Sequence, residues 1–214
     1  MAAMSKVYTE ILDPKRLAVW KRLGEFDDIG ILAGGTGLAL QLNHRRSYDF
    51  DVFCEKEISK KLLLKVKKVF WEYEIEPKVD SGDELSVLLS GDITLSFVSF
   101  PFPKLKETVK TESIDLFSVD DLLSNKAYAI GRRGMWRDYV DIYWTIENKV
   151  SNLKKIIDEA MVRFNGLFAE KLFLEQLVYF DDLQEDTVEW VGNDIKNQKV
   201  KEALMKMVEE YLRF

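Results

Sequence analysis

The chain has little of several residue types, and each scarcity excludes a kind of chemistry. Cys54 is the only cysteine in 214 residues, so an internal disulfide and a cysteine-based zinc cluster are excluded. His44 is the only histidine, which excludes a metal site built from several histidines. Ser-His or Cys-His catalysis would depend on that one residue, and no Gly-x-Ser-x-Gly motif supports it.

Long apolar segments are also absent. No apolar run approaches the ~20 residues that span a bilayer, and the first residues lack the apolar core of a signal peptide. We therefore expect a cytoplasmic protein that has no membrane partner.

Positive charge is in shorter supply than negative charge, with 31 Lys and Arg against 37 Asp and Glu and a net charge of −6. A protein that coats nucleic acid would be basic, so this class is excluded, whereas a local basic site is not. Lysines gather between residues 56 and 68, with the spacing typical of the solvated face of an amphipathic helix.

What is present is an alternation of apolar strands and helices, followed by helices only. Strands are predicted at 29–33, 48–54, 74–79, 85–89 and 93–100, with Gly-Asp turns between the last three. Helices are predicted at 14–27, 36–42, 59–71, 118–130, 136–147, 151–163, 167–181 and 196–212. The pattern predicts an α+β fold with an all-α C-terminal part, which we divide into domains 1–112 and 113–214.

Gly34-Gly35-Thr36 follows a predicted strand and opens a predicted helix. It is not a P-loop, because no Gly-Lys-Ser/Thr follows, and Leu40 stands where a dinucleotide fingerprint needs a small residue. One interpretation is a tight strand-to-helix turn without a ligand. The other is a phosphate site, because backbone N–H groups in such a turn can bind phosphate oxygens.

Asp49 and Asp51 stand one residue apart in the predicted strand 48–54, so their side chains should face the same way. Two neighbouring carboxylates repel each other unless they are exposed or bind a cation. Mg²⁺ is often held by one or two carboxylates together with substrate phosphates. An exposed edge strand is the alternative, but aspartate is unfavourable in strands, and the pair therefore indicates a metal site.

At this point the sequence resembles a known family. Residues 34–40 and 44–53, Gly-Gly-Thr-Gly-Leu-Ala-Leu and His-Arg-Arg-Ser-Tyr-Asp-Phe-Asp-Val-Phe, resemble motif I of the nucleotidyltransferase superfamily, in the form carried by AbiEii/AbiGii toxins. Residues 97–103 resemble the strand-and-proline segment of that family, and residues 119–143 resemble its helical motif. The resemblance covers about residues 28–146 and implies a polymerase-β-like mixed sheet flanked by helices.

The resemblance also implies roles for single residues. Asp49 and Asp51 would bind Mg²⁺ or Mn²⁺, Lys126 would face the triphosphate or the acceptor, and Asp138 would be a structural or catalytic acid. Contacts to the nucleotide are implied for Gly34, Gly35, Thr36, Ser47, Arg46 and Arg137. From the residues alone, Lys126 could instead be a solvated helix lysine, and Arg137, Asp138 and Asp141 could form an ion pair that ties two helices together.

The implied reaction is the Mg²⁺-dependent transfer of a nucleoside monophosphate from an NTP to a hydroxyl group, with tRNA or another RNA as acceptor. The implied role is that of the toxin in a toxin–antitoxin pair, with a cognate antitoxin and a homodimer as further expected partners.

One departure from the family pattern leaves other functions open. Many nucleotidyltransferases carry a third carboxylate on a later strand, whereas here Ser96 occupies that position and Asp92 lies at the turn. A catalytically silent nucleotide-binding protein is therefore one alternative. Nucleotidyl transfer to a small molecule or to a protein is another.

Overall fold

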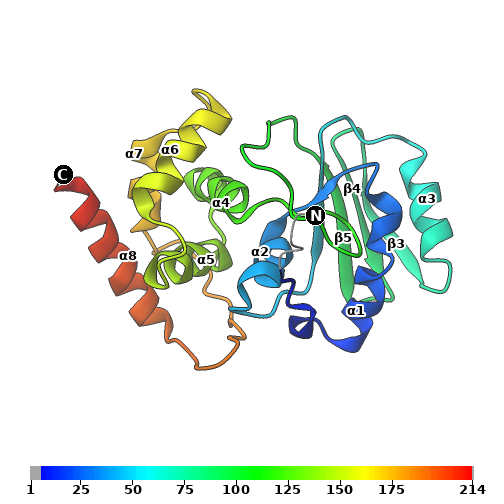
Figure 1. The fold of residues 1–214 in the computed structure, drawn as a ribbon, viewed down its shortest axis with the longest axis horizontal. Helices are drawn as coiled ribbons and strands as arrows, with labels where there is room; N and C mark the ends of the chain where they lie inside the picture. The colour runs from blue at the N-terminus through cyan, green and yellow to red at the C-terminus, as the bar shows by residue number, and fades with distance from the viewer. Residues whose placement is uncertain (1–5, 214) are drawn as a thin grey trace. The chain divides into compact units, whose positions relative to one another are not determined.

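The computed structural model describes residues 6–213 and divides the chain into two compact units (Figure 1). The first unit comprises Met1–Pro103 and Glu107–Ser118, and the second comprises Lys104–Lys106 and Val119–Phe214. The domain boundary expected after residue 112 lies a few residues before this division.

The first unit contains a mixed sheet, as the sequence predicts. Its strands are ordered β1-β2-β5-β4-β3, and β2 runs parallel to β5 while the other neighbours are antiparallel. Their bounds are β1 Ile31–Leu32, β2 Phe50–Cys54, β3 Ile75–Asp80, β4 Glu84–Leu89 and β5 Ile93–Ser99. The two Gly-Asp segments form the turns of the β3–β4 and β4–β5 hairpins, which confirms the α+β prediction for this part of the chain.

One face of this sheet is apolar, and it is covered over the neighbouring strands β2 and β5. Strand alternation sends Phe50 and Val52 of β2 to this face, next to Leu95 and Phe97 of β5, and all four are buried. The Phe97 ring lies 5.1 Å from the ring of Phe26. Three short elements contribute to the core on this side: α1 (Pro14–Trp20), the 3-10 helix η2 (Leu23–Phe26) and α3 (Leu62–Val69). The opposite face carries the polar residues described below.

Two sequence-based boundaries in this unit are wrong for identifiable reasons. The helix expected over 14–27 is broken into α1 and η2, because a 3-10 turn replaces α-helix at Leu23. The strand expected over 48–54 begins only at Phe50, where the pairing with β5 starts, so Asp49 precedes the strand.

The second unit is all helical: α4 Val119–Arg133, α5 Trp136–Glu147, α6 Leu153–Phe164, α7 Glu170–Leu177 and α8 Asn197–Leu212. The prediction that Gly131 ends α4 is wrong. A Cβ on Gly131 would lie 4.0 Å from the main chain of Phe173, an ordinary van der Waals distance, and α4 continues through this position to Arg133. The break comes at Gly134, where a Cβ would lie 2.5 Å from the Tyr139 ring. Among the helices that the structure describes, none is long and apolar enough for a bilayer.

Candidate active site

The glycine turn forms the start of α2, which spans Gly34–Leu42. Its N-cap, Ala33, has no side chain that could cap the helix, and the first intrahelical bond runs from the N–H of Gly37 to the carbonyl of Ala33 at 2.9 Å. The N–H groups of Gly34, Gly35 and Thr36 therefore have no acceptor within the helix. Together with the positive end of the helix dipole, such groups attract anions.

Close neighbours explain why both residues of the turn are glycine. Gly34 has a φ of +62°, and a Cβ there would lie 2.1 Å from Oδ2 of Asp51. A Cβ on Gly35 would lie 2.5 Å from Nη2 of Arg45 and 3.2 Å from Oγ of Ser47. The Asp51 carboxylate thus lies directly against the main chain of the turn, an approach that only glycine permits.

Asp49 is half-buried and lies just before β2. The hydroxyl of Thr36 donates a hydrogen bond to its main-chain carbonyl, and Thr36 Oγ1 lies 2.9 Å from Oγ of Ser47. Both hydroxyl side chains are buried. Thr36 and Ser47 therefore hold the segment that carries Asp49 against α2, and their contact with phosphates stays a prediction.

In the helical unit, Lys126 of α4 lies between two carboxylates of α5. Its Nζ is 2.7 Å from Oδ1 of Asp138 and 2.9 Å from Oδ2 of Asp141, and the Asp141 side chain has no exposed surface. The other oxygen of Asp138 accepts from the N–H of Met135 at the start of α5. An ion pair therefore does tie the two helices together, with Lys126 as its cation.

The predicted residue Arg137 takes no part in that cluster. It is half-exposed and lies 3.5 Å from Asp186. A second buried ion pair, between Arg163 and Asp121, lies nearby in the same unit, with 2.9 Å between the charged atoms and no exposed side-chain surface on either residue. Asp121 also accepts from the N–H groups of residues 105 and 106. No motif in the sequence marks Arg163, so sequence reasoning missed this pair.

Known proteins fit this arrangement. Residues 18–212 match the family model of the nucleotidyl transferase AbiEii toxin, type IV toxin–antitoxin system. The chain belongs to this family. A protein of Aquifex aeolicus described as uncharacterized is 31% identical over 192 residues, which cover 85% of this chain and 87% of the relative.

Solved structures share the fold at lower identity. A putative nucleotidyltransferase from Helicobacter pylori has a TM-score of 0.57 and 19% identity, over 93% of this chain and 95% of its own. MenT4, a nucleotidyltransferase toxin from Mycobacterium tuberculosis, has a TM-score of 0.60 and 14% identity, over 90% and 80%. The chain is accordingly a nucleotidyltransferase by family, and it shares the fold of these solved structures.

Ser96 stands beside Asp51 in the sheet. The two residues are partners across the parallel strands β2 and β5, and Ser96 is in turn the partner of Ser86 on β4. The hydroxyl oxygens of Ser86 and Ser96 lie 3.0 Å apart, and both residues are buried. The register thus gives the position next to Asp51 to a hydroxyl group rather than to a carboxylate.

The residues of the turn and strand suit a divalent cation of the kind this family uses. Asp49 and Asp51 supply carboxylate oxygens, the donors that Mg²⁺ prefers. Across residues 6–213, no three or more His, Cys, Asp or Glu side chains gather in a way that could hold a metal. The binding of a cation by Asp49 and Asp51 therefore stays a prediction, and substrate phosphates and water would have to supply the other ligands.

Arg45 is a functional candidate that the sequence-based selection passed over in favour of Arg46. Its side chain is buried, with Nη2 against the glycine turn, and its Nη1 donates to the carbonyl of Arg46 at 2.9 Å. Arg46 is exposed and donates to the carbonyl of Ile11 at 3.5 Å. The sequence does not distinguish the two adjacent arginines, because β2 begins only at Phe50 and its period of two does not extend back to Arg45.

Cys54, the only thiol, has no role in such chemistry. It is buried on the apolar face at the end of β2, and burial raises the pKa of its thiol to about 11. The residue is therefore a neutral core side chain near pH 7.

Proposed function

We propose that this chain transfers a nucleoside monophosphate from an NTP to a hydroxyl of an RNA, with tRNA as the first candidate, in a Mg²⁺-dependent reaction. The observation that supports this most is the contact between the Asp51 carboxylate and Gly34, at the uncapped start of α2. A carboxylate for a cation and N–H groups that no carbonyl of the helix accepts then stand side by side.

The reaction forms one bond and breaks one bond at the α-phosphorus. The acceptor oxygen bonds to the α-phosphorus, the bond from that phosphorus to the β-phosphate oxygen breaks, and pyrophosphate leaves. The proton of the hydroxyl passes to Asp51 or to water. Phosphoryl transfer depends chiefly on positioning and on electrostatic stabilisation, so a short set of residues suffices.

Each residue of the first unit has a defined task in this proposal. Asp49 and Asp51 would hold the cation, which when bound neutralises charge on the phosphates. The N–H groups of Gly34, Gly35 and Thr36 orient the triphosphate. The buried guanidinium of Arg45 packs against the turn at Gly35 and would hold it in place. In the helical unit we give Asp138 the structural one of its two implied roles, with Lys126 as its ion-pair partner. The nucleotide contacts of Arg46 and Arg137 stay as the family resemblance implies them.

The family's description as a type IV toxin–antitoxin system supports a toxin role. We extend this to a cognate antitoxin as partner and to action in the cytoplasm on cellular RNA. A homodimer belongs to the same proposal and is tested by light scattering of the purified protein.

The reaction is tested by incubating the protein with each α-labelled NTP, Mg²⁺ and total tRNA. Wild type should label RNA, whereas Asp49→Asn and Asp51→Asn should reduce labelling by about 10³-fold or more, because each removes a cation ligand. Both variants should unfold within about 0.5 kcal/mol of wild type, since the carboxylates are half-buried. Asp83→Asn, in the exposed β3–β4 turn, is the matched control and should label normally.

Equal labelling by wild type and by the Asp49→Asn, Asp51→Asn double variant would overturn the proposal. NTP binding in calorimetry without transfer to any acceptor would favour the catalytically silent alternative, which the serine at position 96 supports. If a protein or a small molecule is labelled and RNA is not, the proposed acceptor is wrong and the proposed active site stands.

A further inference from the structure

The outward face of α3 is unusually basic for this chain. Residues 56–71 contain six lysines and one glutamate, whereas the whole chain has more acidic than basic residues. Four of these lysines, together with two apolar side chains, form what we call the α3 ridge: Lys60, Lys61, Leu64, Lys67, Lys68 and Trp71.

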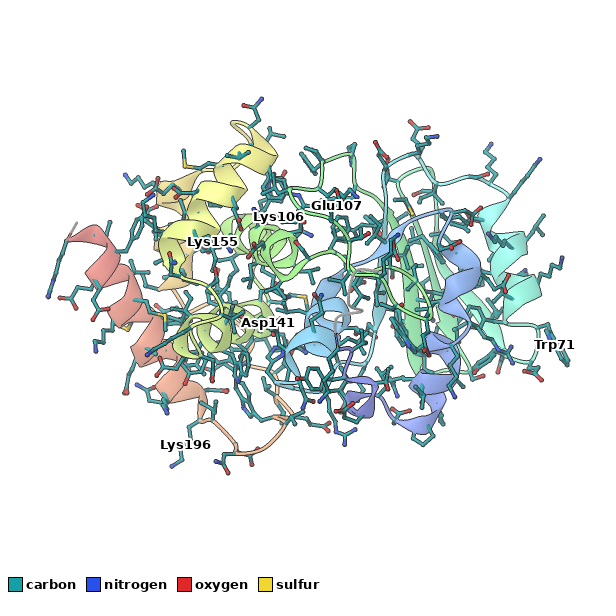
Figure 2. All side chains as sticks on the ribbon, viewed as in Figure 1. Trp71, Lys106, Glu107, Asp141, Lys155 and Lys196 are labelled. Carbon is teal, nitrogen blue, oxygen red and sulfur yellow. The ribbon has the colours of Figure 1, made fainter. Side chains whose placement is uncertain are left out.

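The ridge follows a repeat of seven residues, which is close to two helical turns. Leu64 and Trp71 lie seven residues apart along its middle, and they are 67% and 73% exposed. Within α3, helical spacing places Lys67 and Lys68 on either side of this line, and Lys60 and Lys61 are exposed in the turn just before the helix. Figure 2 labels Trp71, whose side chain points away from the sheet and helices of its unit.

Folding of the unit does not account for these side chains. The opposite side of α3 is buried through Leu62 and Val66, followed by Phe70. Lys65, on the flank, forms an ion pair with Asp28 at 2.8 Å. Within the part of the chain that the structure describes, the four ridge lysines form no ion pair. Exposed apolar side chains ringed by unpaired charge are typical of a surface that binds a partner.

We propose that the α3 ridge binds the RNA acceptor, a proposal that rests on RNA being the acceptor. The lysines would contact phosphates, and Trp71 would stack on an unpaired base, the combination that holds single-stranded RNA without reading its sequence. Charge complementarity favours this occupant, because four lysines without carboxylate partners suit a polyanion. An acidic protein partner is an outcome of the test.

The ridge lies away from the candidate active site within its own unit. α3 packs on the apolar face of the sheet, with Val66 and Phe70 in the core that also contains Val52. Asp51 points to the other face, because alternate residues of β2 alternate between faces. An RNA must therefore be long enough to reach both places, whereas a short acceptor would use only the active site.

This difference defines the experiment. The variant K60Q/K61Q/K67Q/K68Q is compared with K171Q/K196Q/K199Q/K206Q, which removes four exposed lysines from the helical unit. Filter binding of full-length tRNA without NTP is measured over a salt series, and labelling is measured with full-length tRNA and with a four-nucleotide piece of its 3′ end. Thermal melts confirm that all variants are folded.

The ridge variant should bind full-length tRNA at least about 10-fold more weakly, with its salt slope reduced by about 3, while the control variant binds like wild type. Labelling of the four-nucleotide acceptor should be unchanged. Trp71→Ala should weaken tRNA binding by about 5-fold or more without changing the salt slope.

Binding by the ridge variant that equals wild type, or an equal loss in both quadruple variants, would overturn the inference. Unchanged tRNA binding, together with lost binding of an acidic protein such as a purified antitoxin, would make the ridge a protein-binding surface. Binding is measured without NTP and labelling is measured with it. Loss of the ridge proposal, seen in tRNA binding, is therefore distinct from loss of the proposed reaction, seen when wild type fails to label RNA.

Discussion

The two units of this chain handle charge in different ways. In the helical unit, Arg163 and Asp121 are completely buried and paired with each other, and Lys126 is buried between Asp138 and Asp141. In the sheet-containing unit, Asp49 and Asp51 are only half-buried, and the Asp51 carboxylate lies beside helix N–H groups that no intrahelical carbonyl accepts.

The difference separates structural charge from charge that is available for chemistry. A fully buried ion is stable only with a partner, so the helical unit uses ion pairs to fix the relation of α4 to α5 and α6. A half-buried carboxylate keeps part of its hydration and can exchange it for a cation. Substitutions in the two units should therefore affect different measurements.

The largest effect on stability is expected from Asp121→Asn. This change leaves the buried guanidinium of Arg163 without its carboxylate and should lower the free energy of unfolding by about 3–5 kcal/mol. Urea denaturation followed by circular dichroism measures it. The double variant Asp121→Asn, Arg163→Met should recover part of the loss, because it removes both charges and keeps an acceptor oxygen for the N–H groups of residues 105 and 106. A loss of unfolding free energy below about 1 kcal/mol for Asp121→Asn would contradict the claim that the buried charges of the helical unit are structural.

A smaller effect on stability, with a larger one on activity, is expected from Gly34→Ala. Its φ of +62° and the 2.1 Å approach to Asp51 should make the change cost about 1–3 kcal/mol, and displacement of the carboxylate should lower transfer by about 100-fold. Gly82→Ala is the matched control, because nothing lies within 4 Å of a Cβ there. It should stay within about 0.5 kcal/mol and keep full activity. Full activity in Gly34→Ala would show that the turn and Asp51 do not act together.

Much of the fold could be predicted from local patterns. The Gly-Asp turns, the five strands and helix 136–147 follow from apolar periodicity and turn residues, which act over a few neighbours. The errors occur where a residue of another helix or strand determines where an element begins or ends. The break after α4 comes at Gly134, where the Tyr139 ring leaves no room for a side chain, and Asp49 lies outside the strand because the pairing with β5 starts at Phe50.

The candidate site shows the same division. Its glycines and aspartates stand in one short segment, so a single motif marks them. Arg45 was passed over because only the structure shows which of two adjacent arginines lies against the turn. The carboxylate partners of Lys126 lie 12 and 15 residues away on the next helix, where spacing shows that they can meet but not that they do.

The most direct test of the central claim is binding of Mn²⁺, as a substitute for Mg²⁺, measured by electron paramagnetic resonance with and without a non-hydrolysable NTP. With the nucleotide, wild type should bind about one ion at least 10-fold more tightly than without it, because two carboxylates need phosphate oxygens to complete the coordination. Asp51→Asn should lose this tight binding. Equal Mn²⁺ binding by wild type and Asp51→Asn in the presence of nucleotide would contradict the account.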